Sequence, residues 1–265
     1  MKTAIIAIAK NENLYINEWL DYHFKLGFDN IIICENDDEL ILKDVIKDDR
    51  VIIEDFTGIY GVQQVAYQET FRKYKDKFDW FLFIDIDEFL VLEKHDNVRD
   101  FLESFREEPN CIKLTWKHFN DNGELDVIDG NYNVFNRFKT VIETKMDNTT
   151  KQFIKGNISE DDIKNLHQHE IWGRDIHAVD ALGRKVRFLG RQLPDGPINQ
   201  VAWINHYKTK TIGEYVRQKY FRGGPNKNNV RYHRLSYFFE TNEKTPEKVE
   251  YAEKLIKEIE ESMKQ

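Results

Sequence analysis

Short apolar runs alternate with amphipathic helical patterns through the first 119 residues. Each apolar run is continuous, which is typical of strands buried on both faces of a sheet. The runs are residues 3–9, 30–34, 51–54, 79–84 and 111–116. Helical stripes of apolar residues separate some of them, at residues 13–26, 61–74 and 98–105. This alternation predicts an α/β fold, with a mixed, mostly parallel sheet that helices flank on both faces.

The second half of the chain is less regular. Residues 120–200 are rich in Asn, Asp and Gly and contain only scattered strand-like segments. Residues 246–264 read as a strongly charged helix with one apolar face, formed by Val249, Ala252, Ile256 and Ile259. Because no repeat or low-complexity linker interrupts the chain, we expect residues 1–265 to form a single domain with an irregular second half and a C-terminal helix.

Charge and composition narrow the classes of partner. The net charge of -8 argues against nucleic acid as a ligand. Cys34 and Cys111 lie in or beside apolar runs and are expected to be buried thiols. No run approaches the ~20 apolar residues of a membrane span, and residues 1–9 read as a strand rather than a signal peptide. We therefore expect a cytoplasmic protein, with at most a peripheral contact at the inner membrane face.

The segment DWFLFIDIDEFL, residues 79–90, is the most informative stretch for chemistry. An apolar strand leads directly into Asp85, Asp87 and Glu88, and ligands of parallel sheets bind at the carboxyl ends of strands. Strand alternation would place Asp85 and Asp87 on the same side. Paired carboxylates suit Mn²⁺ or Mg²⁺, which would in turn hold a diphosphate. The alternative is a simple acidic turn, but three acids at a core edge without a cation would be costly.

The motif FIDIDEFL resembles the metal-binding signature of GT-A-fold glycosyltransferases, especially family 92 and its bacterial relatives in the family-2-like group. Three further segments carry the same resemblance, which extends over about residues 3–224. They are Lys10-Asn11-Glu12 with Glu18-Trp19-Leu20 and His23, the segment WKHFNDNG at 116–123, and Asn205-His206-Tyr207 with Lys219, Arg222 and Gly223. The second segment departs from the pattern, because Asn120 replaces the usual glycine.

The resemblance implies a GT-A-like fold that binds a nucleotide-sugar, with UDP as the expected nucleotide. Asn11 and Glu12 would contact the nucleotide, although a helix cap and a first-turn acid explain these residues equally well. Asn36 and Asp37 would bond the base or ribose by analogy, and a turn is the alternative. Asp85 would also contribute to binding of the nucleotide-sugar donor.

The same resemblance implies a third metal ligand and a cationic clamp. His206 would bind the metal together with Asp85 and Asp87, since neutral imidazole is a good ligand. A histidine in this position is otherwise usually a packed core residue. Lys208, Lys219 and Arg222 would hold the diphosphate, with residues 223–225 as the bend of a mobile loop. A solvated basic face is the alternative.

An inverting transfer also needs a carboxylate that takes the proton of the acceptor hydroxyl. Candidates are Asp175, Glu170 and Asp121, with Asp175 favoured because it follows Trp172 and Gly173. Trp116 and Trp172 are candidates for stacking on a sugar ring, and core packing is the alternative. A zinc cluster of His167, His169 and His177 is disfavoured by its irregular spacing and the lack of cysteines.

The expected function is therefore metal-dependent transfer of a sugar from a UDP-sugar to a glycan or lipid-linked glycan, with inversion, in surface polysaccharide or lipopolysaccharide synthesis. We expect residues 1–119 to bind the nucleotide-sugar, residues 120–224 the acceptor, and residues 225–265 to form a helical tail. Two alternatives are a metal-dependent nucleotidyl or phosphoryl transferase, and a non-catalytic domain that binds a nucleotide-sugar.

Overall fold

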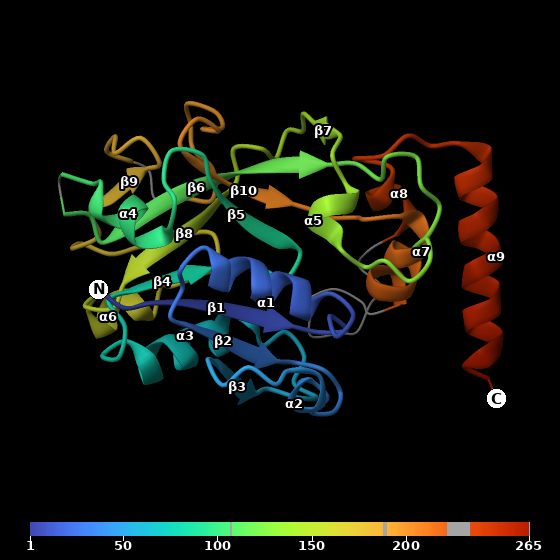
Figure 1. The fold of residues 1–265 in the computed structure, drawn as a ribbon, viewed down its shortest axis with the longest axis horizontal. Helices are drawn as coiled ribbons and strands as arrows, with labels where there is room; N and C mark the ends of the chain where they lie inside the picture. Colours follow the sequence, from blue (N-terminus) through green and yellow to red (C-terminus); the bar gives the residue numbers. More distant parts are fainter. Residues whose placement is uncertain (107, 188–189, 222–233, 265) are drawn as a thin grey trace.

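The computed structural model describes residues 1–106, 108–187, 190–221 and 234–264 (Figure 1). Its first part follows the predicted alternation of strands and helices. These elements are β1 (Thr3–Ala9), α1 (Ile16–Lys25), β2 (Asn30–Glu35), α2 (Leu42–Val45), β3 (Val51–Asp55), α3 (Gln63–Tyr74), β4 (Trp80–Phe83), β5 (Glu88–Leu92), α4 (Val98–Glu103) and β6 (Cys111–Phe119).

The second part supplies shorter elements and the C-terminal helix. They are α5 (Val134–Arg137), β7 (Val141–Ile142), β8 (Thr150–Lys155), α6 (Glu160–Ile163), β9 (Ala178–Asp180), β10 (Ala202–His206), α7 (Ile212–Tyr215), the π-helix η1 (Val216–Tyr220), α8 (Leu235–Phe238) and α9 (Pro246–Ser262). The predicted C-terminal helix is confirmed as α9, which stands at the edge of the molecule beyond the sheet (Figure 1). No described helix is long and apolar enough to cross a bilayer.

The strands form one mixed sheet in the order β3-β2-β1-β4-β8-β6-β10-β5, with β7 and β9 also paired to β6. β3, β2, β1 and β4 are parallel neighbours, as are β6 and β10, whereas β8 pairs antiparallel with both β4 and β6. The predicted mixed α/β class is confirmed. Two strands depart from expectation: β8 comes from the irregular half yet lies in the middle of the sheet, and β5 follows the acidic motif with only a turn between.

Two apolar cores cover the two faces of the sheet. Alternate strand residues explain the division: Ile5 faces the core that contains Trp19 of α1, and Ile6 faces the core that contains Phe71 of α3. Both predicted thiols, Cys34 and Cys111, are buried. A third cluster joins α7, α8 and the apolar face of α9. The arrows of β1, β2, β6 and β10 point toward the side where α5 and α7 lie (Figure 1).

Helix α1 is bonded to the backbone of β5, the strand that follows the acidic motif. Trp19 Nε1 donates to the carbonyl of Glu88 at 2.7 Å, and Tyr22 OH donates to the carbonyl of Leu90 at 2.8 Å. The amide of Leu90 donates to His23 Nε2 at 3.3 Å, while His23 Nδ1 lies 2.8 Å from the carbonyl of Trp19. This arrangement requires a neutral imidazole that carries its proton on Nδ1. Burial lowers the pKa of His23 to about 3.

The buried neutral His23 should make the protein less stable in mild acid. Its folded pKa lies below the ordinary histidine value of 6.5, so the unfolded chain binds a proton that the folded chain does not, and stability falls as pH drops below about 6.5. We expect wild type to lose about 2 kcal/mol more unfolding free energy than His23→Gln between pH 7.5 and pH 5. Urea denaturation at both pH values measures this difference. Parallel losses in the two proteins would contradict it.

Candidate functional site

The acidic motif forms a turn between β4 and β5 at the carboxyl edge of the sheet. Asp85 and Asp87 lie in this turn and not on a strand, so strand alternation does not govern them and the two side chains have different partners. Asp85 Oδ1 accepts hydrogen bonds from Gln63 Nε2 at 3.1 Å and from Tyr67 OH at 3.2 Å. Its Oδ2 lies 2.5 Å from the ammonium group of Lys151.

Lys151 is a fully buried cation that joins Asp85 to Glu88. Its Nζ lies 3.0 Å from Glu88 Oε2, and the same oxygen accepts the amide hydrogen of Asp85 at 2.9 Å. Burial raises the pKa of Glu88 to about 8, although Lys151 opposes this. For Lys151, burial disfavours the charge, but Asp85 and Glu88 outweigh it and the pKa is raised. We therefore assign the charge of Lys151 mainly to Asp85, with Glu88 holding a proton near neutral pH.

Asp87 points to a different cation, Lys219 of η1. Its Oδ2 lies 2.6 Å from Lys219 Nζ, which also donates to the carbonyl of Lys208. Burial disfavours the charge of Asp87, yet Lys219 outweighs it and holds its pKa below the usual range. Lys208 lies over the ring of Tyr237 at 3.5 Å, and burial lowers the pKa of Lys208 to about 8.

His206 is the predicted ligand that the fold brings beside Asp87. Its Nε2 lies 3.7 Å from Asp87 Oδ1 and 4.0 Å from Glu88 Oε1, and burial lowers its pKa well below the usual value, so the ring is neutral. Neither Glu88 Oε1 nor His206 Nδ1 has a hydrogen-bond partner, although both atoms are buried.

The donor set can be compared with the needs of a divalent cation. No three His, Cys, Asp or Glu side chains among the described residues are grouped so as to hold a metal by themselves. A neutral imidazole beside a charged carboxylate nevertheless fits a cation whose remaining positions are taken by ligand oxygens and water. Asp87 and His206 therefore fit two places of such a site, whereas Asp85 is engaged by Lys151.

The four residues expected at the nucleotide do meet at the ends of β1 and β2. The amide of Asn11, a residue with φ of 57°, donates to Asp37 Oδ1 at 2.7 Å. Asn36 donates to the carbonyls of residues 56 and 59, and Glu12 is buried next to them on the following turn. Burial raises the pKa of Asp37, and its Oδ2 has no hydrogen-bond partner.

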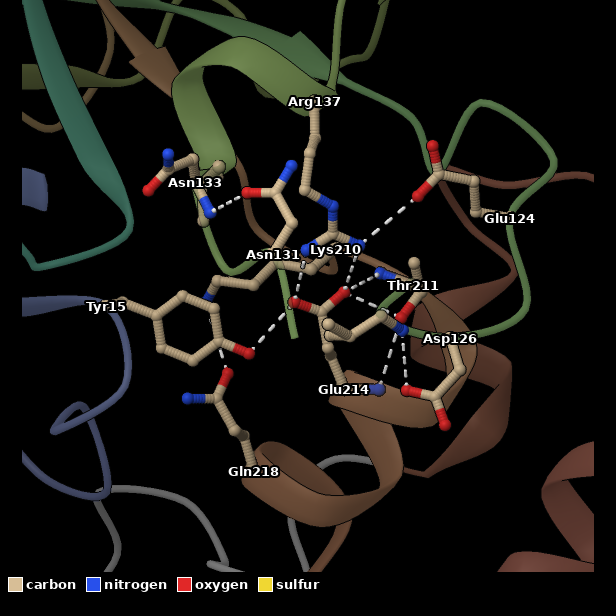
Figure 2. Close-up of polar contacts among 12 residues, drawn as sticks. Tyr15, Glu124, Asp126, Asn131, Asn133, Arg137, Lys210, Thr211, Glu214 and Gln218 are labelled. Carbon is tan, nitrogen blue, oxygen red and sulfur yellow. Dashed lines mark hydrogen bonds and ion pairs between the residues drawn. The ribbon is translucent and has the colours of Figure 1, made fainter. Parts of the chain in front are cut away.

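A buried polar network fixes η1 against this loop (Figure 2). Glu214 accepts hydrogen bonds from Tyr15 OH at 2.9 Å and from two nitrogens of Arg137 at 2.9 and 3.0 Å. Gln218 Nε2 donates to the carbonyl of Asn11 at 2.9 Å. Lys210, which has φ of 56°, donates to Gln218 Oε1 at 3.1 Å. The network therefore connects the expected nucleotide loop to the π-helix that carries Lys219, and π-helical turns are frequent at functional sites.

The structure separates the three acids expected to serve as base. Asp175 lies at the amino end of β6, where its carbonyl accepts a hydrogen bond from Asn110, whereas the acidic turn lies near the other end of that strand. The carboxylate of Asp121 is buried 2.6 Å from Lys248 of α9, so it anchors the C-terminal helix. Neither placement suits a base. Glu170 belongs to the loop whose Gln168 contacts Gln63, the partner of Asp85.

The other expectations have mixed outcomes. Trp116 is buried between His169 and His206, with ring centroids 5.3 and 4.4 Å away, so it packs in the core and is not a platform for sugar stacking. Trp172 is 44% exposed. His177 lies beside Asn110 and so does not join His167 and His169 in a zinc cluster. Arg222 and the bend at 223–225 lie outside the described residues.

Sequence reasoning missed four residues that shape this site: Lys151, Lys210, Gln218 and His118. Lys151 and Lys210 gave no signal, because a lysine in a polar segment normally faces solvent. His118 was visible within the segment WKHF, but only the fold shows that its Nδ1 lies 2.6 Å from Asp147 Oδ1 and that its ring centroid lies 5.0 Å from that of His206.

Comparisons with known proteins give one family match and several more distant structural similarities. The family described as Glycosyltransferase family 92 matches residues 7–264. No curated protein matches the sequence. Among solved structures, S. aureus TarS in complex with UDP is similar at 17% identity and TM-score 0.38, over 48% of this chain and 38% of that one. The 4-diphosphocytidyl-2C-methyl-D-erythritol synthase of Anaerococcus prevotii is similar at 12% identity and TM-score 0.39, over 68% of this chain and 87% of that one.

Replacement of the buried cation should destabilise the turn. Lys151→Met leaves the carboxylate of Asp85 without its ammonium partner, and we expect a loss of about 3 kcal/mol, since Asp85 is partly exposed. Adding Glu88→Gln should change this loss little, because Glu88 already holds a proton near neutral pH. Lys155→Met, in the same strand, is the control and should cost under about 1 kcal/mol. Urea denaturation at pH 7.5 measures all four proteins; wild-type stability of Lys151→Met would show that the cation is dispensable.

Proposed function

This chain belongs to glycosyltransferase family 92, and we propose that it is a metal-dependent, inverting enzyme that moves a sugar from a UDP-sugar to a glycan acceptor. One observation carries the proposal. A charged, buried Asp87 lies between neutral His206 and cationic Lys219, at the sheet edge where the expected nucleotide loop also lies. Such a site combines a ligand pair for a cation with a positive group for a phosphate.

The donor is proposed to lie along this edge. Asn11, Glu12, Asn36 and Asp37 would bind the base and ribose, with the unpartnered Oδ2 of Asp37 as an acceptor for a ribose hydroxyl. Lys219 and Lys208 would bind the diphosphate, Lys219 by turning from Asp87 to a phosphate oxygen. Arg222 is proposed to join them. Asp85 is proposed to contribute to donor binding indirectly, because its ion pair with Lys151 holds the shape of the turn.

A divalent cation, Mn²⁺ or Mg²⁺, is proposed to be held by Asp87 and His206. When bound, it would neutralise charge on the diphosphate as the leaving group departs. Asp85, the third predicted ligand, would join only if Lys151 moved away from it.

Glu170 is the base that the geometry favours for the acceptor hydroxyl. It is half-buried, and its loop reaches Gln63, which bonds Asp85, whereas Lys219 bonds Asp87. In an inverting transfer, a carboxylate there takes the proton while the hydroxyl oxygen attacks the anomeric carbon and the nucleoside diphosphate leaves.

The acceptor is proposed to be a glycan or lipid-linked glycan in surface polysaccharide or lipopolysaccharide synthesis, at the cytoplasmic face of the inner membrane. We propose residues 1–119 as the donor half, residues 120–224 as the acceptor half and residues 225–265 as the tail. The family match disfavours a nucleotidyl transferase, and a binding domain without turnover is excluded if UDP is released from a UDP-sugar.

Metal dependence is tested by chelation together with one substitution. EDTA should abolish release of UDP from UDP-sugars, and Mn²⁺ should restore it. Asp87→Asn should weaken Mn²⁺-dependent UDP binding by more than about tenfold, since even a residue behind a metal ligand contributes that much. Asp79→Asn, at the other end of β4, is the matched control. Calorimetric titration of UDP with and without Mn²⁺ measures the effect, and full turnover in EDTA would reject the metal.

The base is tested by three matched substitutions. Glu170→Gln should lower the transfer rate by about 10²–10⁴-fold while UDP-sugar affinity stays near that of wild type, because a base acts on the acceptor. Asp175→Asn and Asp121→Asn should keep the wild-type rate per folded molecule. Loss of transfer in one of these two moves the role to that residue. If all three variants stay active, a retaining mechanism with the leaving phosphate as base becomes the better account.

A further inference from the structure

A groove of about 610 Å³ lies beside β7, away from the residues proposed for the nucleotide. Its walls are β7 with the turn after it, residues 143–148, and a segment at 196–199. Small-molecule sites commonly have volumes of about 300–1,000 Å³, so the groove has a suitable size for a ligand.

The lining of the groove mixes apolar and polar groups. Val141, Ile142 and Pro197 supply apolar surface, and Glu143 and Asn199 are among the polar residues. A sugar has the same mixture, with apolar C–H faces and hydroxyl groups around its edge. Two lysines, Lys117 and Lys145, balance two carboxylates, those of Glu143 and Asp147. This balance favours an uncharged saccharide over an anion.

Internal hydrogen bonds hold both walls in place. The backbone carbonyl of Asn148 accepts the amide hydrogen of Leu193 at 2.9 Å, and Asn148 Nδ2 donates to the carbonyl of Leu193 at 3.2 Å. That carbonyl also accepts the amide hydrogen of Gly196 at 3.4 Å, which connects the turn to the second wall. Asn148 Oδ1 is buried without a hydrogen-bond partner. Asp147 is fixed by His118 at 2.6 Å and by Thr144 Oγ1 at 2.8 Å. A preformed groove with an unsatisfied acceptor in its lining is suited to bind hydroxyl groups.

The groove is connected to the proposed reaction centre on the acceptor side. Asp147 contacts His118, whose ring lies 5.0 Å from that of His206, and His206 in turn lies 3.7 Å from Asp87. In the sheet, β1 and β2 lie on one side of β4, whereas β6 and its partner β7 lie on the other. The residues proposed to bind the nucleotide and the groove therefore lie on opposite sides of the acidic turn. The donor and the acceptor of an in-line transfer must approach each other from opposite sides in the same way.

We propose that this groove binds uncharged sugar units of the acceptor glycan and so sets the acceptor specificity. The assignment rests on the proposed function, because only a sugar transfer requires an acceptor glycan. A chain of sugars held there extends toward the acidic turn, where its terminal hydroxyl meets the donor.

The first test is binding to the full chain followed by amide NMR. The probes are methyl glycosides of glucose, galactose, mannose and N-acetylglucosamine, each added alone and then with UDP and Mn²⁺. We expect at least one glycoside to shift signals of Gly196, Asn148 and Asn199, and UDP not to displace it. Absence of shifts for all four probes, shifts confined to other residues, or displacement by UDP would each overturn the assignment.

The second test uses variants and the glycoside that binds most tightly. Glu143→Gln and Asn199→Ala should each weaken its binding by about 3–10-fold, the effect of one lost hydrogen bond. Glu108→Gln, an exposed acid near the opposite end of β6, is the matched control and should bind as wild type does. Equal affinities in all of these proteins would overturn the assignment. Failure of wild type to release UDP from any UDP-sugar would contradict the proposed function instead, while the binding data would still assess the groove.

Discussion

The site depends on one interaction, the contact of the buried ammonium group of Lys151 with Asp85 and Glu88. Three acids follow β4 within four residues, and two of them, Asp85 and Glu88, converge on this one cation. Without it, the charge of Asp85 would have no cationic partner at the edge of an apolar core. With it, the turn is fixed, Asp85 is held toward α3, and Asp87 remains directed at His206 and Lys219. The chain itself therefore supplies part of the positive charge that the three acids require.

The fold could be predicted to a large extent, and physical reasons explain where prediction stopped. Strands such as β1 and β2 are short, continuous apolar runs, and the local sequence pattern alone was sufficient to predict them as buried strands. β8 is polar in four of its six positions, and only pairing with β4 and β6 makes it a central strand. Its Lys151 was missed for the same reason: a lysine is informative only when its distant partners are known.

The candidate site shows the same division between local and long-range information. The positions of the acidic turn and of Asn11 beside Asp37 could be predicted, because these residues follow the carboxyl ends of strands and the local sequence shows where those strands end. The positions of the acids in the second half do not follow from local sequence, because loops carry them: Asp175 lies beside Asn110, at the start of β6, and Glu170 lies in the loop that reaches Gln63. The π-helix η1 depends on partners that are distant in the sequence, because Gln218 bonds Asn11 and Lys219 bonds Asp87.

Direct observation of a cation between protein and donor is the decisive measurement for this account. Pulsed electron paramagnetic resonance of Mn²⁺ added with UDP reports nitrogen and phosphorus nuclei close to the metal. The account predicts imidazole nitrogen coupling and phosphorus coupling in the same complex, with the nitrogen signal lost in His206→Ala. A Mn²⁺–UDP complex that shows phosphorus but no nitrogen coupling in wild type would contradict the proposed site.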